Sequence, residues 1–245
     1  MRIVNNNGYE ICFDEFVPEN TTKIVVAVHG FSGDRTSTCI RMLADKLNEN
    51  SIGVVTFDWP AHGESPVDGS FLTIDNCLSD LDFICGFVKN KYPNVPISLF
   101  ATSFGGYLGL LYNHLYSTEF ENIILRAPAI NMYNILTSTI MDENIHKSLE
   151  ETGRFKFGYE REIFIEQKFL DDLEKNDVFK MYDGKKNLNY YIIHGTVDDV
   201  VPIDDSIEFC EKFGSMLYRV EGADHRFKKE GELDRVIDIA FNILK

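Results

Sequence analysis

The stretch that decides the fold reads Ile97-Ser98-Leu99-Phe100-Ala101-Thr102-Ser103-Phe104-Gly105-Gly106. It begins as a short apolar run typical of a buried strand and continues, from Phe104 to Tyr116, as a helical stretch rich in Gly and Leu. A sharp strand-to-helix turn needs small residues two positions before and two positions after its apex, because the two backbones approach closely there. Ala101 and Gly105 meet this need, so the sequence predicts a turn that presents the Ser103 hydroxyl.

The same alternation of apolar runs and helical periodicity extends along the chain. Apolar, β-branched runs predict strands at Lys23–His29, Gly53–Asp58, Pro96–Thr102, Asn122–Leu125, Asn189–Ile193 and Met216–Val220. Helical spacing of apolar residues predicts helices at Thr38–Asn48, Ile74–Val88, Phe104–Tyr116 and Glu232–Leu244. Strands that are apolar on both faces and alternate with helices indicate an α/β fold, with a mostly parallel sheet covered on both faces. A turn signal at residues 5–8 predicts an antiparallel hairpin at the start.

One segment interrupts this rhythm. Between the strand ending near Ala127 and the strand starting near Asn189, about 60 residues form too long a stretch for an ordinary connection. We expect residues 129–186 to form an inserted helical lid after the sixth strand, and residues 1–128 and 187–245 to form the core. The insertion is dense in aromatic residues: Phe155, Phe157, Tyr159, Phe164, Phe169, Phe179 and Tyr182. Most would form the lid's own core, and some would face the substrate, because ligand pockets are mostly apolar.

Three residues capable of joint chemistry follow predicted strands. Ser103 follows one, Asp198 lies in the loop His194–Pro202 after another, and His225 follows the last. Open α/β sheets place their ligand sites at the carboxyl ends of strands. A serine hydroxyl needs a base to act as a nucleophile, and the base needs a carboxylate to fix its tautomer. The chain order Ser, Asp, His is that of a hydrolase with its nucleophile on such a turn, so we predict these three as a catalytic triad.

Two backbone amides complete the predicted site. The Phe31 N–H follows the strand that ends in His29-Gly30, and the Phe104 N–H lies at the start of a helix. Both are placed to donate to the oxyanion of a tetrahedral intermediate.

Competing interpretations of these residues remain open. Ser103 taken alone fits an ordinary helix N-cap, and Asp199 and Asp224 are rivals to Asp198. The histidines His29, His62 and His194 each precede a glycine, and we interpret them as structural groups that satisfy the backbone. No spacing of ligand residues predicts a metal site.

The motifs together resemble the α/β-hydrolase superfamily, in the branch of carboxylesterases, cinnamoyl (feruloyl) esterases and monoacylglycerol lipases. The resemblance spans nearly the whole chain and rests on His29–Phe31, Phe57–Ser65, Asp68–Phe71, the Ser103 turn, and the Asp198 and His225 loops. It implies Ser103 as nucleophile, His225 as base, Asp198 as its partner, the Phe31 and Phe104 amides as oxyanion donors, and a lid in the insertion. Ala61 and Ala101 stand where the family usually has glycine; both are small, so we expect the geometry to survive.

The expected activity is hydrolysis of a small-molecule carboxylic ester through an acyl-enzyme, without cofactor or metal. A thioesterase or small-substrate peptidase uses the same groups, and only the pocket distinguishes them. A hydrolase-fold binding protein that has lost catalysis is the alternative from another class; the presence of all three triad residues argues against it.

The composition of the 245-residue chain limits the kinds of partner that it is expected to bind. The formal net charge of −15 disfavours nucleic acid and anionic lipid surfaces. No run approaches the roughly 20 apolar residues of a membrane helix, and we expect a cytoplasmic protein. No two-residue cysteine spacing suggests a redox or zinc site, so we interpret the cysteines as small buried hydrophobes: Cys12, Cys39, Cys77, Cys85 and Cys210. The sequence leaves the oligomeric state open.

Overall fold

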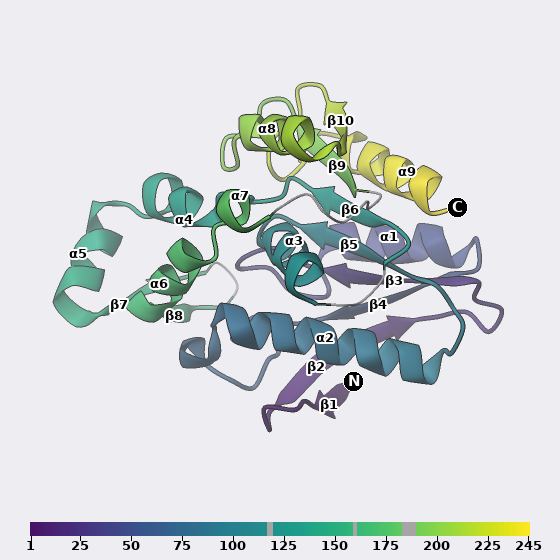
Figure 1. The fold of residues 1–245 in the computed structure, drawn as a ribbon, viewed down its shortest axis with the longest axis horizontal. Helices are drawn as coiled ribbons and strands as arrows, with labels where there is room; N and C mark the ends of the chain where they lie inside the picture. The colour runs from purple at the N-terminus through teal and green to yellow at the C-terminus, as the bar shows by residue number, and fades with distance from the viewer. Residues whose placement is uncertain (117–119, 159–160, 183–189) are drawn as a thin grey trace.

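The computed structural model describes residues 1–116, 120–158, 161–182 and 190–245 (Figure 1). Its main sheet has eight strands in the order β1-β2-β4-β3-β5-β6-β9-β10. Their bounds are β1 Arg2–Val4, β2 Glu10–Phe16, β3 Lys23–Val28, β4 Ile52–Phe57, β5 Ile97–Thr102, β6 Ile123–Arg126, β9 Tyr190–Gly195 and β10 Met216–Val220. Strand β2 pairs antiparallel with both β1 and β4, and the other neighbouring pairs of this sheet are parallel. The mostly parallel sheet and the opening hairpin are therefore confirmed, whereas Asn189, predicted to start a strand, lies outside the described residues.

Helices cover both faces of the sheet, because the central strands are apolar on both sides. Helices α1 (Thr38–Asn48) and α9 (Glu232–Leu244) pack on one face, as predicted to the residue. Helices α2 (Ile74–Lys91) and α3 (Phe104–Leu115) pack on the other, where they lie side by side (Figure 1). Every residue of β4 is buried, as expected for a strand between two helical layers.

Helix α8 (Ile203–Phe213) was missing from the sequence prediction. It begins after Pro202, carries acidic residues in its first turn, and ends at Gly214 in a left-handed conformation with φ 73°. These are ordinary start and stop signals for a helix.

The segment between β6 and β9 lies beside one end of the sheet (Figure 1). It contains α4 Met132–Asn134, a π-helical turn η2 Ile135–Ile140, α5 Glu143–Thr152, β7 Arg154–Phe157, β8 Ile163–Glu166, α6 Gln167–Lys175 and α7 Val178–Met181. The prediction of a wholly helical insertion is wrong, because β7 and β8 pair as an antiparallel sheet. Strand β8 alternates buried and exposed residues, a period of two that marks a strand. Tyr159 and residues 183–186 of the predicted insertion lie outside the described residues.

The sequence predicts that the cysteines are small buried hydrophobes. All five cysteines are free; four are buried and Cys210 is half-buried. Within the described ranges, no helix combines the length and apolar character needed to cross a bilayer.

The hairpin β1–β2 is tied to α2 by a buried carboxyl group. Asp80 of α2 accepts hydrogen bonds from Asn5 Nδ2 at 2.6 Å and from the Tyr9 hydroxyl at 2.9 Å. Burial raises the pKa of Asp80 to about 7, although both hydrogen bonds act to lower it. Asp80 is therefore protonated in the folded state at pH values where it ionises in the unfolded chain.

This shift predicts a pH-dependent stability that Asp80→Asn removes. Between the ordinary aspartate pKa of about 4 and the folded pKa of about 7, the folded protein binds the extra proton. The stabilising contribution of Asp80 is thus present in full below about pH 4 and is lost as the pH rises to about 7. Urea unfolding of both proteins at several pH values checks this: the wild-type free energy of unfolding, relative to that of the variant, should fall across the window. A constant difference would contradict the role.

Candidate active site

Ser103 lies at the apex of the predicted strand-to-helix turn, between β5 and α3. Its backbone has φ 52° and ψ −114°, a conformation that costs a non-glycine residue roughly 1–3 kcal/mol. A Cβ atom on Gly105 would lie 2.5 Å from the His29 carbonyl oxygen, which is why this position holds glycine. Ser103 occupies the N-cap position of α3, but its side chain makes no capping hydrogen bond, so it is not an ordinary N-cap.

The structure brings together the three residues predicted as a triad. Ser103 Oγ lies 3.1 Å from His225 Nε2, and His225 Nδ1 lies 2.8 Å from Asp198 Oδ2. Because Nδ1 faces a carboxylate, it carries the ring proton, which leaves Nε2 to accept from the serine hydroxyl. Asp224, the nearer rival in sequence, instead accepts the Arg226 backbone N–H. Among the described residues, no hydrogen bond or ion pair joins Asp199 to His225, although both line the same cavity.

Asp198 accepts four hydrogen bonds with its two carboxylate oxygens. Oδ1 accepts from the amides of Val200 at 3.0 Å and Val201 at 2.8 Å. Oδ2 accepts from His225 and, at 3.1 Å, from His194 Nε2. Burial alone would raise the pKa of Asp198, but the hydrogen bonds from His194 and His225 outweigh it and hold the pKa well below its usual range.

His194 is the residue near the site that the sequence interpretation missed. Its Nε2 faces two acceptors, the Asp198 carboxylate and the Val201 carbonyl, so this nitrogen carries the proton. Its Nδ1 then accepts from the Ser206 hydroxyl at 2.8 Å. The sequence predicts a histidine that serves the backbone, whereas His194 contacts two side chains as well as the Val201 carbonyl. The signal available in the sequence was its position four residues before Asp198 at the end of a strand.

The two predicted oxyanion donors flank Ser103. A Cβ atom on Gly30 would lie 3.1 Å from Ser103 Cβ, so the loop carrying Phe31 packs directly against the serine. Among the described residues, neither the Phe31 nor the Phe104 amide has a hydrogen-bond partner. Their rings contact each other edge to face, with centroids 5.4 Å apart. Both N–H groups are therefore available to a ligand beside Ser103.

A mostly apolar cavity of about 320 Å³ opens at Ser103 beneath the insertion. The insertion contributes Met132, Ile135, Ile140 and Phe157 to its wall. Of the predicted insertion aromatics that the structure describes, Phe157 lines this cavity. Phe155 and Phe169 are buried in the hydrophobic core, and Phe164 is exposed. A second cleft of about 500 Å³ also opens at Ser103, between β6 and the start of α1.

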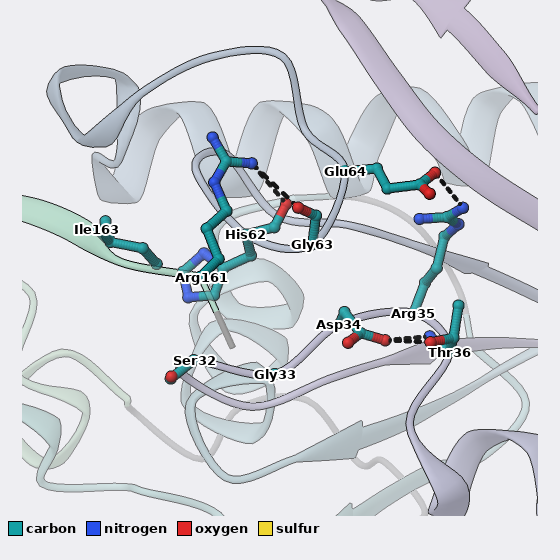
Figure 2. Close-up of a pocket in the computed structure, with 10 residues that line it drawn as sticks. All are labelled: Ser32, Gly33, Asp34, Arg35, Thr36, His62, Gly63, Glu64, Arg161 and Ile163. Atoms are coloured by element: carbon teal, nitrogen blue, oxygen red, sulfur yellow. Dashed lines mark hydrogen bonds and ion pairs between the residues drawn. The ribbon is translucent and has the colours of Figure 1, made fainter. Parts of the chain in front are cut away.

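Arg161 fastens the insertion to the loop that follows β4 (Figure 2). Its Nη1 donates to the carbonyl oxygens of Gly63 at 3.1 Å and Ser65 at 2.6 Å, and its Nη2 donates to that of Val67 at 2.9 Å. One guanidinium thus satisfies several loop carbonyls at once. The fastening holds the β7–β8 hairpin, and with it Phe157, against the core.

The loop after β4 shows how alanine replaces the usual glycine. Ala61 has φ 65°, in the left-handed region that favours glycine, so the turn keeps its shape at a cost in strain. Gly63 admits no substitute, because its Cβ atom would lie 2.4 Å from Asp58 Oδ1. Ala101 lies in β5, where extended backbone suits any residue. The geometry survives at both positions, as predicted.

His29 and His62 serve the backbone, as expected from the sequence. His29 Nδ1 donates to the Gly30 carbonyl at 2.8 Å, and His62 Nδ1 donates to the Pro60 carbonyl at 2.9 Å. Burial lowers the pKa of His29 to about 4 and that of His62 to about 3, so both rings are neutral at pH 7. Within the described part of the chain, no cluster of three or more His, Cys, Asp and Glu side chains has the arrangement of a metal site.

The chain shares sequence with proteins of known class over part of its length. A family model described as serine aminopeptidase, S33, matches residues 19–152. A monoacylglycerol lipase of Mycolicibacterium smegmatis is 23% identical over 129 residues, which are 52% of this chain and 45% of that protein. The match thus spans less than half of that relative's length.

Solved structures match over the whole chain. Est1E from Butyrivibrio proteoclasticus, solved with ferulic acid bound, has a TM-score of 0.82 and 18% identity, and the match covers 100% of both chains. Alpha/beta hydrolase domain-containing protein 10 from mouse has a TM-score of 0.79 and 14% identity, with 100% of this chain and 97% of that chain covered. Similarity at this level of identity establishes the fold. Since the family model also covers more than half of the sequence, the chain is an α/β hydrolase that belongs to the family described as serine aminopeptidase, S33.

Proposed function

We propose that this α/β hydrolase is a serine esterase that cleaves carboxylic esters through an acyl-enzyme. The observation that carries the proposal is the continuous set of contacts from Ser103 Oγ to His225 Nε2 and from His225 Nδ1 to Asp198. A hydroxyl, an imidazole and a buried carboxylate in this order are the groups that acyl transfer requires. Similarity to a monoacylglycerol lipase and to Est1E with bound ferulic acid supports esters as the substrates.

The proposed reaction proceeds in two halves. His225 Nε2 takes the hydroxyl proton as Ser103 Oγ attacks the ester carbonyl, and the imidazolium is stabilised by Asp198. The tetrahedral oxyanion accepts hydrogen bonds from the Phe31 and Phe104 amides. These bonds stabilise the negative charge that develops on the oxygen in the transition state. His225 then protonates the departing alcohol. Water, deprotonated by the same imidazole, releases the acid and restores Ser103.

The substrate pocket we propose is the apolar cavity beneath the insertion, with residues 129–186 acting as a lid. Met132, Ile135, Ile140 and Phe157 would contact an apolar acyl or alcohol group. The fastening by Arg161 supports a lid whose hairpin forms a wall of the pocket.

A peptidase is the second candidate, because the matching family is described as a serine aminopeptidase. The same three residues cleave amides and thioesters. A panel of short-chain, long-chain and aromatic esters, an acyl-CoA and an aminoacyl amide separates these activities. A fluorophosphonate probe tests the alternative that this chain is a binding protein without catalytic activity. The probe labels Ser103 only if the serine is a reactive nucleophile.

Replacing Ser103 by alanine should abolish turnover and leave the fold intact. The loss in kcat should reach about 10⁵-fold or more, since the nucleophile has no substitute. Alanine keeps the Cβ atom and the backbone demands of the turn, so the thermal midpoint should stay close to that of the wild type. Ser79→Ala, in α2 and outside the site, is the matched control. Esterase activity near the wild-type level in the Ser103 variant would contradict the assignment of Ser103 as the nucleophile.

His194 should act as a positioning residue for Asp198. His194→Phe removes a donor to Oδ2 and should lower kcat by up to about 10²-fold with little change in KM, because the carboxylate loses its fixed orientation. His194→Gln retains an amide donor and should recover part of the loss. Steady-state kinetics of both variants, with circular dichroism to confirm folding, provide the check. Equal kcat values for the two folded variants would show that the hydrogen bond does not matter.

A further inference from the structure

The cleft of about 500 Å³ beside Ser103 brings together two sources of positive charge. Its walls include the first turn of α1 on one side and Arg126, the last residue of β6, on the other. Arg226, next to His225, also lines it. The cavity beneath the insertion opens at the same serine and shares Arg226 with the cleft, but the rest of its wall includes the apolar residues Met132, Ile135 and Ile140 of the insertion.

Arg126 is a buried cation without an acidic partner. The residue is 6% exposed, and none of the described carboxylates lies within ion-pair distance of it. Nη2 makes one long hydrogen bond, 3.3 Å to the His225 carbonyl, and the guanidinium lies 4.6 Å from the centre of the Phe227 ring. Nε is buried without a partner. Leaving a buried charge uncompensated is costly, so an anion in the cleft would stabilise this arrangement.

The α1 terminus adds to this positive character. Ser37, Thr38 and Cys39 line the cleft. The Ser37 side chain does not cap the helix, and no acidic residue lies in its first turn. By contrast, α2 is capped by the Thr73 side chain. The first amides of α1 therefore remain available, and the partial positive charge of a helix N-terminus favours an anion there.

Arg126 and the first turn of α1 face the same part of the cleft. The pKa of the Cys39 thiol is raised by burial and lowered in part by the charge of Arg126, which places the guanidinium near the first turn of α1. Asp34 is the acidic residue in the described cleft wall. Its Oδ1 is engaged by the backbone N–H of Thr36 at 2.6 Å and the Thr36 hydroxyl at 2.7 Å, as Figure 2 shows.

We propose that this cleft is an anion subsite, and that the substrate is an ester bearing a carboxylate close to the scissile bond. The carboxylate binds between Arg126 and the first turn of α1, where the Arg126 guanidinium supplies the charge and the free amides supply hydrogen-bond donors. The apolar remainder of the ester occupies the cavity beneath the insertion. This inference rests on the proposed esterase activity and names its substrate class.

Matched substrate pairs in which a carboxylate replaces a methyl group test the subsite. For the acyl side these are ethyl hydrogen glutarate and ethyl pentanoate; for the alcohol side, the acetate esters of 4-hydroxybenzoate and of 4-methylphenol. In at least one pair the wild-type kcat/KM should favour the anion by about tenfold or more, the effect of a charge-assisted hydrogen bond. Ratios near one in both pairs would overturn the proposal.

Two variants locate the effect. Thr38→Glu places a carboxylate at an exposed position of the cleft wall and should remove the preference, whereas Asn144→Glu, which adds the same charge at an exposed site on α5, should retain it. Arg126→Met should lower kcat/KM for the anionic ester far more than for its neutral partner. Because Arg126 also contacts the His225 loop, an equal fall for both partners would show a purely structural role and contradict the subsite.

Binding to the Ser103→Ala protein separates this inference from the proposed activity. Calorimetry with ethyl hydrogen glutarate and with 4-acetoxybenzoate measures binding without turnover. At least one of the two ligands should bind to the Ser103→Ala protein. Adding Thr38→Glu to this protein should weaken that binding more than adding Asn144→Glu. If neither ligand binds, the anion subsite fails, whatever the activity on neutral esters. If the anion binds as expected but wild type cleaves no ester, the esterase activity fails instead.

Discussion

The close packing of backbone segments around Ser103 is the constraint on which the rest of the site depends. The Ser103 amide donates to the Arg126 carbonyl at 2.9 Å, and the Ser103 carbonyl accepts from the Ala129 amide at 3.0 Å. Gly30 and Gly105 lie where a Cβ atom would meet the serine or the preceding loop. The strained backbone at Ser103 persists because these neighbours leave it no room to relax. The same packing points the hydroxyl away from α3 and toward His225.

Asp198 extends this fixed geometry to the far side of the site. Four donors saturate its two oxygens, so the carboxylate stays ionised although it is buried. The two backbone amides come from its own loop, one imidazole comes from the end of β9, and the other comes from the loop that follows β10. One carboxylate therefore joins the end of β9 to the loop after its neighbour β10, and the orientation of His225 depends on contacts that continue through His194 to Ser206.

The insertion contributes to the core as well as to the pocket. The Phe31 ring lies within 5.9 Å, centroid to centroid, of Phe157 and Phe169, both from the insertion. The loop carrying Phe31, one of the two proposed oxyanion donors, is thus supported by the segment that forms part of the wall of the apolar cavity. Arg161 reaches the loop after β4 from the same hairpin. The proposed substrate pocket and the proposed oxyanion donors share their packing, so substitutions in the hairpin can affect both.

The sequence by itself determined the alternating strands and helices, the turn at Ser103 and the order of Ser103, Asp198 and His225. These follow from local patterns, namely apolar periodicity and the small residues that a tight turn demands. The tertiary structure decided which neighbours these residues have. It distinguished Asp198 from Asp199 and Asp224, placed His194 on the carboxylate, paired β7 with β8, and left Arg126 without an acid beside the first turn of α1. Contacts between residues far apart in the chain depend on strand order and side-chain packing. Neither can be read from the periodicity of the sequence, which reflects only local structure.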